Sequence, residues 1–316
     1  MKINLKKHLR NIINACIVDP LHYHQRTEER TNIIFQELTS IKDMLNATSN
    51  EVSLISNEVS LTSIKNSRLY DMMKVHYDQI TFLREKLVNV RKTEEYESIF
   101  NNYEPLITVR IATYNNAKGL VERAIKSVLA QTYQNFEIIV VGDHCTDDTE
   151  EKIRAIGDSR ISFHDFPFRN IYPEDAVHNW MVAGSPGMNL GAELANGDWI
   201  APLDDDDEFT EDHLEKLLRF ALDERYEMVY GKIISRSVKD GKEKEIWSYP
   251  PEHGKFSFQG AIYMKLLNFF EWDVNSWVVD EPGDWNMCRR MMTTGVRIGA
   301  MEDVVGIIHF LHLKKR

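Results

Sequence analysis

Cysteine is scarce in this chain of 316 residues, where Cys16, Cys145 and Cys288 lie far apart. An odd number of cysteines without a ligand-like pair argues against a disulfide framework and a cysteine zinc site, and is typical of a reducing compartment. Long apolar runs are missing as well, so no transmembrane helix is expected. The basic stretch 2–10 lacks the apolar core and cleavage site of a secretory signal. We therefore expect a cytoplasmic protein.

Positive charge is also in deficit, because 38 Lys and Arg face 49 Asp and Glu, giving a net charge of -11. Such a balance argues against a nucleic-acid partner. Residues 1–13 are an exception, since lysines and an arginine alternate there with isoleucines and leucines. This stretch predicts either a weak interfacial helix on an anionic membrane or an N-terminal helical segment, within 1–26, that packs on its own protein.

Glycine and proline are absent from residues 27–94, and a seven-residue repeat runs through this stretch. Position a holds Leu38, Leu45, Val52, Val59, Asn66, Met73, Ile80 and Leu87, and position d holds Ile34, Ile41, Thr48, Ile55, Thr62, Leu69, His76, Leu83 and Val90. The repeat predicts a coiled coil over 27–93 and a homo-oligomer formed through 34–90. The mixed occupants do not specify the number of strands. An intramolecular hairpin broken near Ser49-Asn50 or Ser67 is the alternative.

The pattern changes after residues 94–104, a polar stretch without the repeat that we interpret as a linker. From 105 to 316 short apolar runs alternate with amphipathic stretches. Strands are expected at 106–113, 136–141, 160–164, 199–203, 228–234, 296–298 and 304–308, and helices at 119–131, 147–156, 188–194, 211–221 and 284–294. This alternation predicts an α/β domain with a mostly parallel sheet flanked by helices. The long connection 165–186 is expected to be functional.

The stretch Trp199–Phe209 joins an apolar run to four consecutive carboxylates, Asp204 to Asp207. Acidic runs are usually solvated surface, but a strand ending in aspartates at the carboxyl edge of an α/β sheet is a typical ligand site. Hard oxygen donors suit Mg²⁺ or Mn²⁺ bridged to a diphosphate. A calcium loop starting at Asp204 is excluded, because Phe209 stands where the sharp turn requires glycine.

Four blocks occur in an order that resembles the family 2 glycosyltransferases, which are inverting enzymes with the GT-A nucleotide-sugar fold. The blocks are Ile111–Asn116, Val140–Thr149, Asn189–Asp207 and Asp284–Met291. The resemblance covers about two thirds of the chain and leaves out the heptad repeat. It implies a GT-A domain and transfer of a sugar from a nucleotide donor, with a UDP-sugar favoured, to a hydroxyl acceptor in glycan, glycolipid or protein glycosylation.

The resemblance also assigns roles to residues. It implies that the donor is bound by Thr113, Tyr114, Asn115, Asp143, Asn189, Asp204 and Asp205, with Asp143 accepting the imide N–H of uracil. It implies that Mn²⁺ or Mg²⁺ is bound by Asp204 and Asp206, with Asp206 the first choice as direct ligand. A C-terminal histidine completes the metal shell in many relatives, and we favour His309 over His312.

Asp284 is the expected general base, because inversion requires a base on the face opposite the leaving diphosphate. A simple helix N-cap is the alternative for this residue. Three residues depart from the family pattern: Gly142 and Gly283 replace acidic residues, and Met188 stands where relatives often have arginine.

Gln259 and either Trp247 or Trp277 are candidates for sugar contacts. Two other functions remain open. One is a coiled-coil oligomeric scaffold that carries a degenerate nucleotide-sugar-binding domain. The other is a sugar nucleotidyltransferase, although no glycine-rich phosphate loop with basic residues follows the first expected strand.

Overall fold

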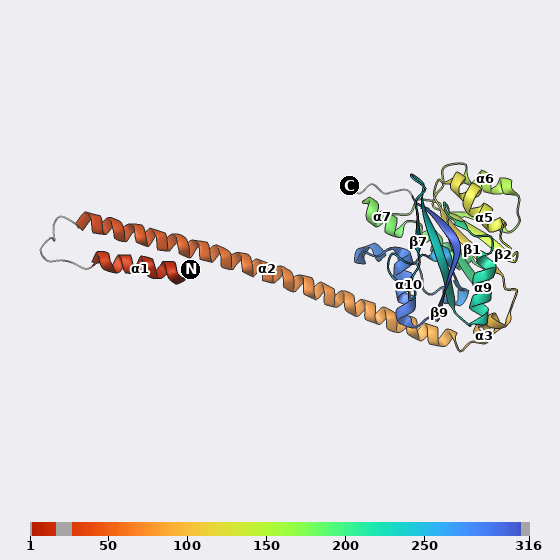
Figure 1. Ribbon diagram of the computed structural model, residues 1–316, viewed down its shortest axis with the longest axis horizontal. Coiled ribbons are helices and arrows are strands. Elements are labelled where there is room, and N and C mark those ends of the chain that lie inside the picture. The colour runs from red at the N-terminus through yellow and green to blue at the C-terminus, as the bar shows by residue number, and fades with distance from the viewer. Residues whose placement is uncertain (1, 17–26, 311–316) are drawn as a thin grey trace. The chain divides into compact units, whose positions relative to one another are not determined.

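The structure is a computed structural model that describes residues 2–16 and 27–310 (Figure 1). The chain divides into two compact units, Met1–Tyr77 and Asp78–Arg316. No helix in the described part of the chain is both long and apolar enough to cross a membrane.

The first unit consists of helix α1 (Lys2–Cys16) and most of helix α2 (Thr27–Val90). Helix α2 is continuous, because no glycine or proline interrupts it, so the expected alternative of a hairpin broken near residue 49 or 67 is wrong. Helix α1 packs on α2 through Asn11, whose Nδ2 donates to Glu37 Oε1 at 2.8 Å, and through the His8–Glu37 ion pair. The face of α1 that carries His8 and Asn11 therefore packs on the same chain, as one of the two expectations for the N-terminal segment predicted.

Two apolar surfaces of the first unit remain exposed. On α1 the exposed stripe consists of Leu5, Leu9 and Ile13. On α2 the exposed residues of positions a and d are Leu38, Leu45, Val52, Ile55, Val59, Leu69 and Met73. The coiled coil therefore stays a prediction, with its seam open to solvent in the single chain.

The linker expected at 94–104 is not found, because this stretch contains helix α3 (Glu94–Asn101). Thr93 caps the helix by accepting a hydrogen bond from the backbone N–H of Tyr96, and Tyr96, Ile99 and Phe100 are buried. The loss of the heptad therefore marks a new capped helix whose apolar face joins the core, rather than a flexible connection. The end of α2 joins the same core through Ile80, Leu83 and Leu87, so the second unit starts well before residue 105.

A buried ionic cluster within the second unit holds α3 and the residue after α2 against the rest of that unit. Glu227 is 0% exposed and accepts hydrogen bonds from Arg91 Nε at 2.7 Å, from Tyr96 Oη at 2.6 Å and from the backbone N–H of Arg297 at 2.7 Å. Burial raises the pKa of Glu227, but the hydrogen bonds from Arg91 and Tyr96 outweigh it and hold the pKa below its usual value. The carboxylate is therefore ionised and paired inside the fold.

The described part of the second unit contains one sheet of nine strands, in the order β3-β2-β1-β4-β8-β6-β9-β5, with β7 paired to β6. The strands are β1 (Ile107–Thr113), β2 (Phe136–Gly142), β3 (Ile161–Asp165), β4 (Trp199–Asp204), β5 (Glu208–Phe209), β6 (Met228–Ser237), β7 (Glu243–Ile246), β8 (Ala261–Met264) and β9 (Ile298–Phe310). Strands β3, β2, β1 and β4 are parallel, and β8 joins them antiparallel. The expected α/β fold class is confirmed, and the parallel strands end at one edge.

Helices cover both sides of the sheet, and Figure 1 shows α9 and α10 on opposite sides of β9. The helices are α4 (Ala117–Gly119), η2 (Leu120–Ile125), α5 (Lys126–Leu129), α6 (Thr149–Ile156), α7 (Ala176–Val182), α8 (Ser185–Leu194), α9 (His213–Asp223), η3 (Phe258–Gly260), η4 (Lys265–Leu267), η5 (Ser276–Val279) and α10 (Gly283–Thr294). The helix expected at 119–131 is formed by α4, η2 and α5 together. The long connection 165–186 holds α7 and the start of α8.

Candidate active site

The carboxyl edge of the parallel strands carries the acidic turn. Strand β4 is buried and pairs with β1, so that Asp204 lies opposite Ala112, one residue before the end of β1 at Thr113. The chain then turns through Asp205, Asp206 and Asp207 into β5. The register of a buried strand therefore places the carboxylates beside the first strand's polar end, as a ligand site of an α/β sheet requires.

The carboxylates of this turn disfavour one another's charge. Burial, followed by repulsion from Asp206 and Asp205, raises the pKa of Asp204 to about 7. Burial raises the pKa of Asp205 to about 6, although hydrogen bonds from Thr113 and Asn116 lower it. Burial also raises the pKa of Asp206 and Asp207, against smaller opposing effects. Such a cluster is stabilised when a cation neutralises it.

Two of the four carboxylates are engaged by neighbouring elements. Asp205 accepts hydrogen bonds from Thr113 Oγ1 at 2.6 Å and from Asn116 Nδ2 at 3.0 Å. Asp207 is 3% exposed and accepts from the backbone N–H of His309 at 2.8 Å. Asp206 and Asp204, whose carboxyl also receives a hydrogen bond from the Gln259 side chain, are the remaining candidates to bind a cation.

The donor set fits Mg²⁺ or Mn²⁺ held partly by a substrate. No group of three or more His, Cys, Asp or Glu within the described residues is arranged to hold a metal ion. Mg²⁺ is commonly bound by one or two carboxylates together with substrate phosphates rather than by an all-protein cage. The hard oxygens of Asp204 and Asp206 can supply that share, with a diphosphate supplying the rest.

The histidine expected to complete the metal shell lies next to this turn. His309 Nε2 is 2.9 Å from Glu208 Oε1, and the backbone N–H of His309 donates to Asp207. Its role as a ligand stays a prediction. His312 lies outside the described residues.

A cavity of about 480 Å³, here named the nucleotide cavity, lies at the ends of β1 and β2. It is lined by Thr113, Tyr114, Asn116, Asp143, Arg169, Trp180, Gly184, Gly187 and Asp204 to Asp206, among others. The structure thus brings together Thr113, Tyr114, Asp143, Asp204 and Asp205, five of the residues expected to bind the donor. The Arg169 guanidinium lies over the Tyr114 ring, 3.5 Å from its centroid.

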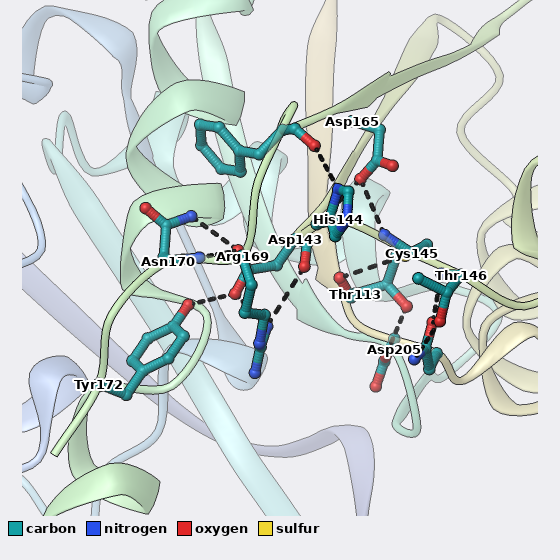
Figure 2. A network of polar contacts seen from close by, with 12 residues as sticks. Thr113, Asp143, His144, Cys145, Thr146, Asp165, Arg169, Asn170, Tyr172 and Asp205 are labelled. Carbon is teal, nitrogen blue, oxygen red and sulfur yellow. Dashed lines mark hydrogen bonds and ion pairs between the residues drawn. The ribbon is translucent and has the colours of Figure 1, made fainter. Parts of the chain in front are cut away.

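Asp143 anchors the connection that follows β3 (Figure 2). Its Oδ1 accepts from the backbone N–H of Asn170 at 3.0 Å and from Asn170 Nδ2 at 2.7 Å, and its Oδ2 accepts from Tyr172 Oη at 2.6 Å and from Arg169. A carboxylate has about four acceptor sites, and these donors fill them. A base that used Asp143 as its acceptor must therefore displace one of the donors.

The turn after β2 is held by side chains from two other strands' ends. Asn115 Oδ1 accepts from the backbone N–H groups of Thr146 at 2.7 Å and Asp147 at 3.3 Å. Asn115 does not line the nucleotide cavity, although it was expected to bind the donor. Asp165 Oδ1 accepts from the backbone N–H of His144 at 2.9 Å. A Cβ added to Gly142 would lie 2.4 Å from Asp165 Oδ1. Glycine at position 142, where the family pattern has an acidic residue, therefore leaves room for the carboxylate of Asp165 from β3.

Asn189 lies outside the nucleotide cavity, contrary to its expected role. Its Nδ2 donates to the carbonyl of Trp272 at 2.9 Å, and its Oδ1 accepts from the backbone N–H of Trp272 at 2.8 Å. Both halves of the amide are thereby used to hold the segment after η4 against α8. Asn189 has a structural role in this fold.

A second cavity, here named the reaction cavity, has a volume of about 370 Å³ and adjoins the first. It is lined by Trp180, Asp204, Asp207, His253, Gln259, Trp272, Gly283, Asp284 and Trp285, among others. Trp180, Ala183, Met188 and Asp204 line both cavities. The two spaces therefore meet at Asp204.

Asp284 lies in the first turn of α10, after the N-cap residue Pro282, so the alternative of a helix N-cap is wrong. Burial raises the pKa of Asp284 to about 6, against lowering effects that include the backbone N–H of Trp285 and the charge of His253. A carboxylate with this pKa is suited to accept a proton near neutral pH. A Cβ on Gly283 would lie 3.2 Å from Trp272 Cε3 and 3.4 Å from the Met181 carbonyl, so a side chain there would require these neighbours to shift by a few tenths of an ångström.

Of the residues expected to contact a sugar, Gln259 lines the reaction cavity, and its Oε1 accepts from the backbone N–H of Asp204 at 2.8 Å. Trp247 donates instead to the Met301 carbonyl at 2.9 Å, and the Trp277 ring lies 5.3 Å from that of His178. Neither tryptophan lines the two cavities. Sequence reasoning missed Arg169 and Trp180, whose only signal was their place in the long polar and aromatic connection.

Comparison with known proteins agrees with this geometry. The family model described as Glycosyl transferase family 2 matches residues 108–281. The UDP-Glc:alpha-D-GlcNAc-diphosphoundecaprenol beta-1,3-glucosyltransferase WfaP of Escherichia coli is 33% identical over 46% of this chain and 53% of its own length. The GalNAc(5)-diNAcBac-PP-undecaprenol beta-1,3-glucosyltransferase of Campylobacter jejuni is 32% identical over 41% of this chain and 38% of its own. The chain thus spans about half or less of these relatives.

Among solved structures, Staphylococcus aureus TarS 1–349 in complex with UDP-GlcNAc has a TM-score of 0.52 at 15% identity, covering 65% of this chain and 58% of that one. This likeness shows a common GT-A-like fold. The family model spans more than half of the chain and includes Tyr114, Asp143 and the acidic turn. The chain therefore belongs to glycosyl transferase family 2.

Proposed function

We propose that the protein transfers a sugar from a UDP-sugar to a hydroxyl group of a glycan acceptor, with inversion at the anomeric carbon. The observation that carries the proposal is the meeting of two cavities at Asp204. One cavity holds Tyr114, Asp143 and Arg169, which suit a base and ribose, and the other holds Asp284.

The donor half of the proposal rests on the nucleotide cavity. The base lies near Tyr114 and Arg169, and the diphosphate lies at the acidic turn and the start of α8, where the N-cap residue Gly184 and the helical residue Gly187 line the cavity. Backbone N–H groups at a helix N-terminus favour phosphate oxygens. UDP is the favoured nucleotide, because Asp143 can accept from the uracil imide once one of its four donors leaves.

Asp204 and Asp206 would hold Mn²⁺ or Mg²⁺, which when bound stabilises the negative charge of the leaving nucleoside diphosphate. Asp284 accepts the proton of the attacking hydroxyl. Its raised pKa and its place in the reaction cavity, beyond Asp204, suit attack from the side opposite the leaving group.

The acceptor class is proposed from the relatives. WfaP and the Campylobacter jejuni enzyme are both named for glycans linked to undecaprenol through a diphosphate. A lipid-linked acceptor lies at a membrane surface, and α1 offers the exposed apolar stripe Leu5, Leu9 and Ile13 together with exposed Lys6 and Arg10. Peripheral contact with an anionic membrane through residues 1–13 fits this composition.

Helix α2 adds a proposed homo-oligomer. Its residues at positions a and d form a long exposed apolar stripe, which is unfavourable for a helix surrounded by water. Pairing with a second copy of α2 would bury this stripe. A scaffold without catalysis is less well supported, because the carboxylates that turnover needs line the two cavities.

Thermal unfolding with UDP, GDP, CDP and dTDP, each with and without Mn²⁺, tests the donor assignment. A ligand at a hundred times its dissociation constant stabilises a protein by about 2.7 kcal/mol. We expect the largest rise in midpoint temperature with UDP and Mn²⁺ together. The absence of a rise with all four nucleotides would refute the proposed function.

A further inference from the structure

Trp180 on α7 is exposed beside the site. The six tryptophans of the chain all lie among the described residues, and Trp180, at 58% exposure, is the only one classed as exposed. Its side chain makes no hydrogen bond or ring contact with any residue that the structure describes. A large aromatic side chain held in this way is available to a ligand.

Trp180 lies where the two cavities meet. It lines the nucleotide cavity with Asp204 and lines the reaction cavity with Gln259 and Asp284. An acceptor hydroxyl at Asp284 therefore lies in a cavity that Trp180 also lines. The ring lies where an acceptor approaches the donor.

Helix α7 is held firmly although it belongs to a long connection. Asp175 caps it by accepting from the backbone N–H of His178 at 3.0 Å, and Asn179 Nδ2 donates to the Pro173 carbonyl at 3.3 Å. The His178 ring packs on Trp277 of η5. The indole is thus presented by a fixed helix, which reduces the entropy lost on binding.

The surroundings of Trp180 are apolar and acidic. Val177, one helical turn earlier, is 56% exposed, and Val278 on the contacting η5 is 59% exposed. Asp175 and Asp280 at the ends of these two helices are exposed as well. The reaction cavity that Trp180 lines also contains Asp204, Asp207 and Asp284 against one histidine, His253, so it suits a neutral ring with one apolar face and several hydroxyls and disfavours an anionic sugar.

We propose that the Trp180 indole stacks on the pyranose ring of a neutral acceptor sugar and holds its hydroxyl toward Asp284. This subsite rests on the proposed function, because Asp284 acts as the base only in that reaction. Gln259 lines the same cavity, where its Oε1 accepts from the backbone N–H of Asp204.

Binding of simple glycosides tests the subsite without requiring turnover. The full chain, loaded with UDP and Mn²⁺, is studied by saturation-transfer NMR with the methyl β-glycosides of glucose, galactose and N-acetylglucosamine, and with methyl β-glucuronide as the anionic probe. We expect at least one neutral glycoside to bind and the glucuronide not to bind. Trp180→Ala should weaken that binding about tenfold or more, a loss of about 1.4 kcal/mol, whereas Trp180→Phe should stay within about threefold.

Val238→Ala is the matched control, since it removes exposed apolar surface at a position that lines neither cavity, and it should leave glycoside binding unchanged. UDP affinity, measured separately by calorimetry, should fall less in Trp180→Ala than glycoside affinity does, although Trp180 also lines the nucleotide cavity. Equal binding by the wild type and Trp180→Ala, no glycoside bound by the wild type, or an equal loss of UDP affinity would each overturn the subsite. Failure of the wild type to bind UDP would instead refute the proposed function.

Discussion

Replacement of Asp284 by asparagine is expected to remove turnover and leave donor binding intact. The change keeps the shape of the side chain and removes its ability to accept a proton. Loss of a positioned general base lowers a rate by about 10²- to 10⁴-fold, which corresponds to roughly 2.7–5.5 kcal/mol of activation free energy. UDP affinity should change less than about twofold, because Asp284 lines the reaction cavity and not the nucleotide cavity.

The wild-type pH dependence gives a second readout of the same residue. Asp284 acts as a base only when ionised, and burial raises its pKa from 3.8 to about 6. We therefore expect kcat to fall about tenfold per pH unit below about 6 and to be level above it. The folded state binds this proton more tightly than the unfolded chain does, so the contribution of Asp284 to stability falls as pH rises from about 4 to about 6. The asparagine variant avoids that loss, which is on the order of 3 kcal/mol, and should unfold at pH 8 no more easily than the wild type.

Release of UDP in the presence of an acceptor measures turnover, and calorimetry with UDP measures donor binding. Asp280→Asn is the matched control, since Asp280 is exposed and has a φ of 59°, which asparagine tolerates. Wild-type turnover by the Asp284→Asn variant at pH 8 would refute the assignment. So would a loss of turnover that is accompanied by an equal loss of UDP affinity.

Three further changes test other parts of the molecule. With UDP present, Mn²⁺ should raise the midpoint of thermal unfolding by about 5–10 °C. Asp206→Asn should abolish this Mn²⁺-dependent rise, whereas the surface control Asp223→Asn should leave the rise intact. Asp143→Asn removes the charge that holds segment 169–172. The dissociation constant of UDP, measured by calorimetry, should therefore rise about tenfold or more. An unchanged dissociation constant would contradict a role in UDP binding for the hydrogen bonds around Asp143. Ile55→Lys in the exposed seam of α2 should convert an oligomer to monomer in analytical ultracentrifugation, whereas Asn57→Lys outside the seam should not; a monomeric wild type would count against the coiled coil.

The strands of the second unit could be predicted because each is a short apolar run buried by the sheet. The runs at 107–113 and 199–204 end in polar residues, so the position of Thr113 next to the acidic turn followed from parallel pairing alone. Residues that act directly after a strand were therefore placed well. Tyr114 and Asp143 line the nucleotide cavity for this reason, whereas Asp284 follows η5 and a short loop rather than a strand.

The rest depends on contacts between segments that are distant in the sequence. Nothing local shows that the connection after β3 folds back so that Asn170 and Tyr172 donate to Asp143, or that both halves of the Asn189 amide are bound to Trp272. Helix α3 was missed for another reason. Its glutamates made the stretch look solvated, although Tyr96 and Phe100 share one buried face.

The ionic cluster around Glu227 has a consequence for how a catalytic fragment is cut. The family model begins at residue 108, and a boundary drawn there discards Arg91 and Tyr96. Glu227 would then keep its place in the interior without two of its donors, and breaking a buried pair in this way costs about 3–5 kcal/mol. The apolar faces of α3 and of residues 80–87 would be lost as well. A soluble, minimal catalytic fragment should therefore start near Asp78, where the second compact unit begins.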